Sequence, residues 1–184
     1  ARALSVLVAI RDAIIKTPFD EDTRSLLSLC LSSVLWITSK QCRAESTQVL
    51  DATYYIPHEI KELNVWQSFS QKVQRLAKAK AQQVFRETRC VISTQSATDL
   101  SEIPSESIDY IFTDPPYGAK YQYGQLNLLW EAWLGMDRSW YANELVVADH
   151  RDMGWANWRK VFFEASKEMY RVLKSGRWLT LCYH

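Results

Sequence analysis

The chain has 184 residues, 47% of them apolar, and its 22 basic residues are balanced by 21 acidic ones. This length fits one ordinary domain, or one domain with a helical extension. The apolar content excludes a disordered chain, and the small net charge excludes a nucleic-acid binder that depends on a large basic excess. A local basic face that binds nucleic acid remains compatible with this balance.

The cysteines and the apolar runs indicate a cytoplasmic protein. The four cysteines form no C-x-x-C pair and no zinc-ligand spacing, so we expect reduced thiols and no metal site: they are Cys30, Cys42, Cys90 and Cys182. No signal peptide is visible, and the most apolar run, 26–37, is shorter than the roughly 20 residues of a membrane span. Because the chain begins within a helical pattern and ends on a strand pattern, we expect it to be part of a longer protein.

Helical patterns dominate the first 89 residues. Apolar residues recur at helical spacing over 3–16, and Pro18 then interrupts the pattern. A second, very apolar helix is predicted over 23–39 and a third over 62–87. Residues 43–58 have no clear period and contain a possible short extended piece. We therefore expect a helical N-terminal region at 1–89.

The third predicted helix carries a basic arc. Residues 71–89 contain six basic side chains and one acid, Glu87. At 100° per residue, two groups separate: the cations Lys72, Arg75, Lys78, Arg86 and Arg89, and the apolar side chains Phe69, Val73, Leu76 and Val84. The basic arc is either a solvated helix face or a contact for DNA phosphates.

From residue 90 the pattern changes to alternating strands and helices. We predict these elements in order: a strand at 90–94, a strand at 107–114, a helix at 125–134 closed by Gly135, an irregular stretch at 136–154, a helix at 155–173, a turn at Ser175-Gly176 and a final strand at 177–184. The continuous apolar run at 107–114 predicts burial on both faces, as in a parallel sheet. The order is that of an α/β fold with parallel crossovers.

An unusual corner, Asp114-Pro115-Pro116-Tyr117, follows the strand predicted at 107–114. In open α/β sheets the ligand crevice lies outside the carboxyl ends of the strands. The two prolines fix φ and have no N–H to donate, so we expect both of their carbonyls to remain free acceptors in a stiff loop. Asp114 adds a charged acceptor and Tyr117 a flat aromatic face. This set suits a planar group that carries an exocyclic amine.

Such a pocket has a clear chemical use. The exocyclic amine of adenine or cytosine is a poor nucleophile, because its lone pair is delocalised into the ring. Two acceptors would favour a more tetrahedral nitrogen and would stabilise the positive charge that develops as a methyl group arrives. Asp114 or a water molecule would then take the proton. A base within a duplex would have to be flipped out to reach the corner, and stacking on Tyr117 would offset part of that cost.

The tetrad at the end of an apolar strand resembles the catalytic motif of amino-group DNA methyltransferases. Three longer strings are also similar to that family, and in part to large bacterial adenine-specific methylases: "SATDLSEIPSESIDYIFTDPPYG", "LNLLWEAWLG" and "ASKEMYRVLKSGRWLTL". The resemblance covers about 90–184 and implies a Rossmann-like class I methyltransferase core. We expect 90–184 to be the catalytic half of that domain, continuing beyond the chain.

The resemblance implies S-adenosylmethionine as cofactor and DNA as partner. It implies that Asp114, Pro115, Pro116 and Tyr117 hold the target base and that Asp114 also lies at the cofactor. For three further residues the resemblance implies a role that has an alternative. Asp99 would lie near the cofactor's adenine, or it is a helix-cap or turn acid. Tyr121 and Tyr123 would contact DNA or the base, or they are exposed or partly packed loop residues.

One family feature is missing. The family binds its cofactor through a Phe-x-Gly-x-Gly-type turn, whereas no two of the five glycines here form a G-x-G pair and the first 117 residues contain none. The order resembles the beta class of the family, in which the catalytic half comes first. We therefore expect this chain alone to bind the cofactor poorly and to be inactive or nearly so.

Three functions compete at this stage. The leading hypothesis is methylation of DNA, at adenine N6 rather than cytosine N4, in restriction and modification or another role. The first alternative is a non-catalytic DNA-binding or scaffold module of a defence system that derives from a methyltransferase. The second is a methyltransferase for RNA or for protein amide nitrogen, in which Asn is typical where Asp114 stands.

Overall fold

The computed structural model describes residues 2–42, 56–82 and 89–183. Contacts divide the chain into two units. The first, the helical unit, comprises Ala1–Glu87 and Gly124–Ser139; the second, the sheet unit, comprises Thr88–Tyr123 and Trp140–His184. The limit of the first segment lies beside the boundary predicted at residue 89, and the later segment 124–139 packs with the helices.

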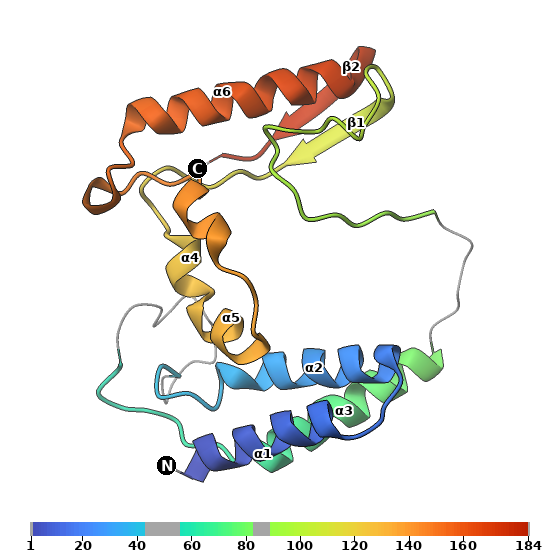
Figure 1. The fold of residues 1–184 in the computed structure, drawn as a ribbon, viewed down its shortest axis with the longest axis vertical. Coiled ribbons are helices and arrows are strands. Elements are labelled where there is room, and N and C mark those ends of the chain that lie inside the picture. Colours follow the sequence, from blue (N-terminus) through green and yellow to red (C-terminus); the bar gives the residue numbers. More distant parts are fainter. Residues whose placement is uncertain (1, 43–55, 83–88, 184) are drawn as a thin grey trace. The chain divides into compact units, whose positions relative to one another are not determined.

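Three long helices form the helical unit: α1 (Arg2–Lys16), α2 (Glu21–Leu35) and α3 (Val65–Gln82) (Figure 1). Asp20 caps α2 by accepting a hydrogen bond from the Thr23 backbone N–H, 2.9 Å. The apolar stripes meet in one core: Leu7, Ile10, Ile14, Cys30, Leu31, Val34, Leu35, Val65 and Phe69. The helical pattern of the N-terminal region is thus confirmed for the described residues.

The segment 124–139 completes the core of the helical unit. Its helix is α5 (Leu128–Leu134), separated at Asn127 from the short α4 (Tyr123–Leu126), where one helix was predicted. Trp130 stacks on Trp36 with ring centroids 6.3 Å apart, and its indole N–H donates to the Ser32 carbonyl, 3.0 Å. Gly135 ends α5 with φ +66°, which confirms the predicted cap.

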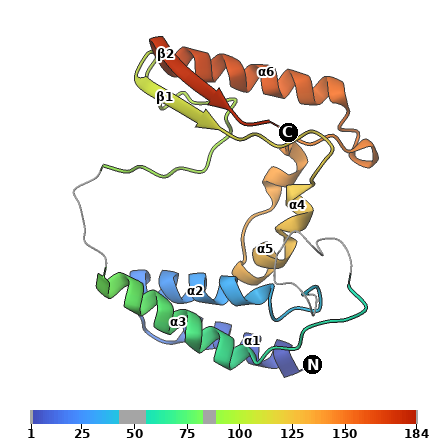
Figure 2. The same ribbon diagram turned by 180° about the vertical axis from the view of Figure 1, so that it is seen from behind.

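A two-stranded parallel sheet forms the centre of the sheet unit. The strands are β1 (Ile108–Thr113) and β2 (Leu173–Leu181), with the register running from Tyr110↔Trp178 to Thr113↔Leu181. Helix α6 (Trp155–Val172) leads directly into β2 (Figures 1 and 2). Parallel pairing is confirmed. The described residues form a mixed α/β unit, and they do not contain the full sheet of a Rossmann-like core.

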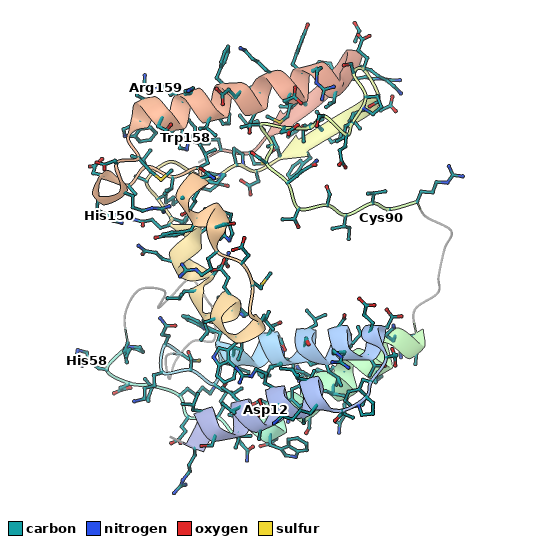
Figure 3. The ribbon with its side chains drawn as sticks, viewed as in Figure 1. Asp12, His58, Cys90, His150, Trp158 and Arg159 are labelled. Atoms are coloured by element: carbon teal, nitrogen blue, oxygen red, sulfur yellow. The ribbon has the colours of Figure 1, made fainter. Side chains whose placement is uncertain are left out.

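The strand predicted at 90–94 was wrong, and so was the burial on both faces predicted for the strand at 107–114, which is present as β1. The segment 90–94 pairs with no strand among the described residues, and Val91 and Ile92 are more than 90% exposed (Figure 3, Cys90). A β-branched run becomes a strand only where a partner strand is available. Tyr110 and Phe112 in β1 are 55% and 63% exposed. Both side chains lie on one face of the sheet, and no described element covers that face, so β1 is not buried on both faces as predicted.

The predicted turn at Ser175-Gly176 was also wrong. Both residues lie within β2, where Gly176 has φ +72°. The pairing is irregular between Ile108 and Tyr110 of β1, whose partners are Leu173 and Trp178. The additional residues of β2 are accommodated there, so the strand continues through the predicted turn.

The remaining predictions concern connections. The stretch predicted to be irregular contains two short 3-10 helices, η2 (Ser139–Asn143) and η3 (Asp149–Arg151), and a bridge between Ala148 and Met153. Most of the possible extended piece at 43–58 and the end of the third predicted helix, with Arg86, lie outside the described residues. None of the helices in the described part of the chain has both the length and the apolar character needed to cross a membrane.

Candidate functional site

The Asp-Pro-Pro-Tyr corner begins where β1 ends. The Cys182 backbone N–H donates to the Thr113 carbonyl, 2.9 Å, so the end of β2 stays beside the end of β1. Asp114 follows directly and is exposed, whereas Pro115, Pro116 and Tyr117 are half-buried. The corner therefore lies at the carboxyl ends of both parallel strands, the position at which open α/β sheets bind ligands.

Asp114 and Tyr117 are joined by a short hydrogen bond. The Tyr117 hydroxyl donates to Asp114 Oδ1 at 2.5 Å. This hydrogen bond, together with partial desolvation and the charge of Asp114, raises the pKa of Tyr117 to about 12. Tyr117 therefore remains protonated at neutral pH. The bond fixes the orientation of the carboxylate and leaves its second oxygen available to another donor.

The two proline carbonyls differ in their use. The Pro116 carbonyl accepts the Gly118 N–H at 3.1 Å, so the expectation that both carbonyls are open acceptors was wrong for Pro116. A turn forms there because Gly118 can take a φ of +59°. The Pro115 carbonyl accepts no hydrogen bond from the residues that the structure describes. Asp114 Oδ2 and the Pro115 carbonyl are thus two open acceptors at the corner.

Gly118 is required by its surroundings as well as by its φ. A Cβ at this position would lie 2.6 Å from Cη2 of Trp155, in the first turn of α6. The Gly118 carbonyl accepts the Val147 N–H at 3.0 Å. The glycine therefore lets the corner approach α6 and the 146–148 segment closely, which fixes the loop after Tyr117.

A pocket of about 710 Å³ opens beside Asp114. Helix α6 supplies an apolar wall of Val161, Phe162, Ala165 and Met169, and the 94–98 segment and the 143–145 segment form other walls. Asp114, Pro115 and Pro116 all line it. Its size and its mixture of apolar walls with a few polar groups are typical of a small-molecule or nucleobase site.

A buried ion pair holds one wall of this pocket. Glu144 is 6% exposed, and its Oε2 accepts Arg151 Nη1 at 2.7 Å. Arg151 also donates to the Tyr141 carbonyl and lies 3.8 Å from the centroid of the Tyr141 ring. The sequence reasoning missed this pair, because the two charges stand seven positions apart in a stretch without helical periodicity.

A second charged pair fixes the loop between 98 and 107. Arg171 Nη2 donates to the Leu100 carbonyl at 2.8 Å, and Arg171 Nη1 donates to the Ile103 carbonyl at 3.0 Å. Glu168 accepts the Leu100 N–H at 2.9 Å and also binds Arg171 at 2.8 Å. These bonds attach the loop to α6, next to the 94–98 wall of the pocket. We name Glu168 and Arg171 the loop clamp.

The loop clamp makes the free energy of unfolding depend on pH. The hydrogen bond from Arg171, followed by that from the Leu100 N–H, lowers the pKa of Glu168 to about 2 from 4.5. Because the pKa is lower in the folded protein, this stabilisation is complete above about pH 4.5 and is lost as the pH falls towards 2. We expect Glu168→Gln to lower the free energy of unfolding at pH 7, and its difference from the wild type to shrink below pH 4.5.

Urea unfolding of both proteins at pH 7, 4.5 and 3 measures this difference. Glu164→Gln is the matched control, since Glu164 is an exposed acid of the same helix that forms no ion pair with the described residues. If the free energies of unfolding of Glu168→Gln and the wild type differed by the same amount at all three pH values, the clamp would not have the role proposed for it.

The structure separates the other predicted site residues. Tyr123 lines the pocket, whereas Tyr121 does not; their ring centroids are 6.0 Å apart. Asp99 is exposed and is not part of the pocket wall. Its Oδ1 accepts the Ser101 N–H at 3.1 Å, and hydrogen bonds from Ser101 lower its pKa. The geometry of Asp99 is that of a turn acid, and its role at a cofactor stays a prediction.

Two residues near Tyr117 were not found by sequence reasoning. Lys120 Nζ lies 5.7 Å from the Tyr117 ring centroid and 5.8 Å from that of Tyr121. Tyr183 meets Tyr117 at an interplanar angle of 81°, with centroids 5.6 Å apart, and also contacts Trp158. Figure 3 shows Trp158 and Arg159 on different sides of α6. Lys120 stands only three residues after Tyr117, and this short separation is the one sequence signal for their contact.

Comparisons with known proteins give no further information on this site: no family model, no curated protein and no solved structure matches the chain.

Proposed function

We propose that the sheet unit is the base-binding half of a DNA methyltransferase that acts on an exocyclic amine, with adenine N6 as the preferred target. The observation that carries the proposal is the pair of open acceptors, Asp114 Oδ2 and the Pro115 carbonyl, beside a pocket at the carboxyl ends of parallel strands. Both acceptors come from adjacent residues on a stiff corner. An amine with two N–H bonds is the matching ligand.

The corner would orient the amine for reaction. One N–H of the amine donates to Asp114 and the other to the Pro115 carbonyl, which directs the nitrogen lone pair away from both. As the nitrogen gains a methyl group, positive charge develops on it, and the nearby carboxylate stabilises that charge. The nitrogen then releases one proton to Asp114 or to water. The hydrogen bond from Tyr117 keeps the carboxylate in place throughout.

Tyr117 and Lys120 would hold the rest of the nucleotide. The Tyr117 ring can stack on the base, which contributes on the order of 1–3 kcal/mol. Lys120 lies over this ring but is exposed, and a cation–π contact at an exposed site is worth only about 0.5–1 kcal/mol. Lys120 would therefore move from the ring to the phosphate of the flipped nucleotide, a stronger partner for an ammonium group.

The described residues fit a base better than they fit the whole cofactor. S-adenosylmethionine would supply the methyl group through its sulfonium. Its ribose diol needs an acidic acceptor, yet Asp99 lies outside the pocket wall and Glu144 is engaged with Arg151. The sequence also has no paired glycines for the cofactor turn. We therefore propose that residues outside this chain bind the cofactor, and we assign this chain only the handling of the base.

Binding to short oligonucleotides tests the proposal on the chain itself. The probes are single-stranded thymine tracts with one central adenine, cytosine or hypoxanthine, each with a fluorescent label. Hypoxanthine has a carbonyl in place of the amine. Its carbonyl oxygen would therefore lie against Asp114 Oδ2 and the Pro115 carbonyl without a hydrogen to donate to either. Since a hydrogen bond to a charged group is worth about 1.5–3 kcal/mol, adenine should bind about tenfold to a hundredfold more tightly than hypoxanthine.

The same series has a control and a contradicting outcome. Asp149→Ala removes another exposed carboxylate of the sheet unit and should retain the preference for adenine. Equal affinity for the adenine and hypoxanthine probes would contradict an amine site. Tighter binding of cytosine than of adenine would instead change the proposed target to cytosine N4.

A second candidate is a non-catalytic DNA-binding or scaffold module with a vestigial pocket. Two observations favour it: the absence of paired glycines from the sequence, and a pocket wall on which Asp114 is the one acid left open among the described residues, so that no second acid is available for a ribose diol. This candidate predicts DNA binding without methyl transfer. The complete tetrad with its two open acceptors favours the catalytic proposal.

A further inference from the structure

The solvent side of α3 differs in charge from an ordinary exposed helix face. Six of its exposed residues share one arc and include no carboxylate: Gln67, Gln71, Gln74, Arg75, Lys78 and Gln82. We name them the acid-free face. By comparison, the exposed residues of α6 carry both signs, with Arg159, Lys160 and Glu164 close together. On the acid-free face no carboxylate offsets the charges of Arg75 and Lys78.

The opposite side of α3 is fixed by the core. Val65 and Phe69 are buried in the core of the helical unit, and Val73 and Leu76 pack against it. The acid-free face is therefore held on the outside of the unit rather than free to rotate. At 1.5 Å per residue, it extends over about 22 Å from Gln67 to Gln82.

The cations of α3 are not neutralised within the described residues. No ion pair joins Lys72, Arg75, Lys78 or Lys80 to an acid there. On the neighbouring helix α1, Asp12 is engaged by Lys16 at 3.0 Å and by Arg11 at 3.5 Å. The positive charge of α3 is therefore available to an external anion.

We propose that the acid-free face of α3 binds the phosphate backbone of duplex DNA. Arg75 and Lys78 supply charge, and the glutamine amides supply neutral donors of the type that commonly contact phosphate oxygens. The absence of carboxylates matters because each would repel a phosphate. The inference rests on the proposed function, to which it adds a surface that positions the substrate outside the base pocket. Arg89, which was predicted to lie on the basic arc of this helix, belongs instead to the sheet unit, in a stretch without regular secondary structure.

The test is the salt dependence of binding to a labelled 20-base-pair duplex, followed by fluorescence anisotropy between 25 and 200 mM salt. Each phosphate contact contributes about 0.9 to the slope of log K against log salt. The double variant Arg75→Gln/Lys78→Gln should therefore lower that slope by about 2 and weaken binding about tenfold or more near 0.1 M salt. Glutamine is a good helix former, so α3 should persist, as far-UV circular dichroism will check.

Two further variants make the result specific. Arg159→Gln/Lys160→Gln removes the same charge from α6 and should leave the slope unchanged. Arg75→Lys/Lys78→Arg retains the charge and should bind as the wild type does. An unchanged slope in Arg75→Gln/Lys78→Gln, an equal loss in the α6 variant, or tighter binding of duplex RNA than of DNA would each overturn the inference.

The inference and the proposed function can fail separately. Methyl transfer by Asp114→Ala reports on the proposed function, whereas the salt slope of Arg75→Gln/Lys78→Gln reports on the α3 surface. If no methyl transfer occurs but Arg75→Gln/Lys78→Gln still loses affinity for DNA, only the proposed function fails. If methyl groups are transferred and the α3 variant binds DNA normally, only the present inference fails.

Discussion

Asp114→Ala is expected to lower kcat/KM for methyl transfer by at least about a hundredfold, the loss that removal of one preorganised polar group at a reacting atom typically causes. The variant loses the charged acceptor of the amine, the stabilisation of the developing positive charge and a candidate proton acceptor. It also releases the Tyr117 hydroxyl, which donates to Asp114 in the wild type. The measurement uses labelled S-adenosylmethionine and unmethylated DNA with the full-length product of the gene that encodes this chain.

Two comparisons separate the chemistry of Asp114 from a general loss of structure. Asp149→Ala should remain within about twofold of the wild type, because Asp149 lies outside the site. Tyr117→Phe keeps the ring and removes only the hydroxyl, so its loss should be smaller than that of Asp114→Ala. If Asp114→Ala kept full activity, Asp114 would have no role at the amine.

Gly118→Ala is expected to destabilise the sheet unit by about 2–5 kcal/mol. A non-glycine residue at positive φ costs roughly 1–2 kcal/mol, and forcing an atom into a filled site costs roughly 1–3 kcal/mol. Both costs apply here, since Gly118 has φ +59° and its Cβ would lie 2.6 Å from Trp155. Urea unfolding followed by circular dichroism measures the change, and loss of the adenine preference would accompany it.

Gly176→Ala is the matched control. Gly176 also has a positive φ, +72°, but a Cβ there would meet no atom within 4 Å. This variant should therefore show the backbone cost alone, about 1–2 kcal/mol. Adding Trp155→Ala to Gly118→Ala should recover part of the clash term. Equal destabilisation by Gly118→Ala and Gly176→Ala would show that Trp155 does not constrain the corner.

Local sequence patterns were sufficient to predict the helices that bury one apolar face. The stripes of α1, α2, α3 and α6 are regular, and Gly135 marks the end of α5, so these were predicted correctly apart from their limits. Strand predictions depended on partners far away in the sequence. "CVIST" has the composition of a strand, but no partner for it exists among the described residues. The interruption at Asn127 and the path of 124–139 into the helical unit depend on tertiary packing, which periodicity does not contain.

The sequence identified the corner but not its support. Asp114 and Tyr117 were recognisable because an acid and a ring flank two prolines after a strand. That Pro116 is already used by Gly118, while Pro115 is open, depends on the turn that Gly118 forms. Glu144 and Arg151 lie in a stretch without helical periodicity, so no spacing rule indicates their ion pair. Glu168 and Arg171 have the i, i+3 spacing of a helical ion pair, but their bonds to the 100–103 loop depend on tertiary structure.

Methyl transfer by the wild-type gene product tests the central claim most directly. The protein is incubated with unmethylated DNA and labelled S-adenosylmethionine, and the nucleosides are then separated and identified by mass spectrometry. The account predicts label in N6-methyladenine, and none when this 184-residue chain is used alone. A folded gene product that binds DNA and the cofactor yet labels no base would contradict it, and would assign the chain to the non-catalytic DNA-binding class.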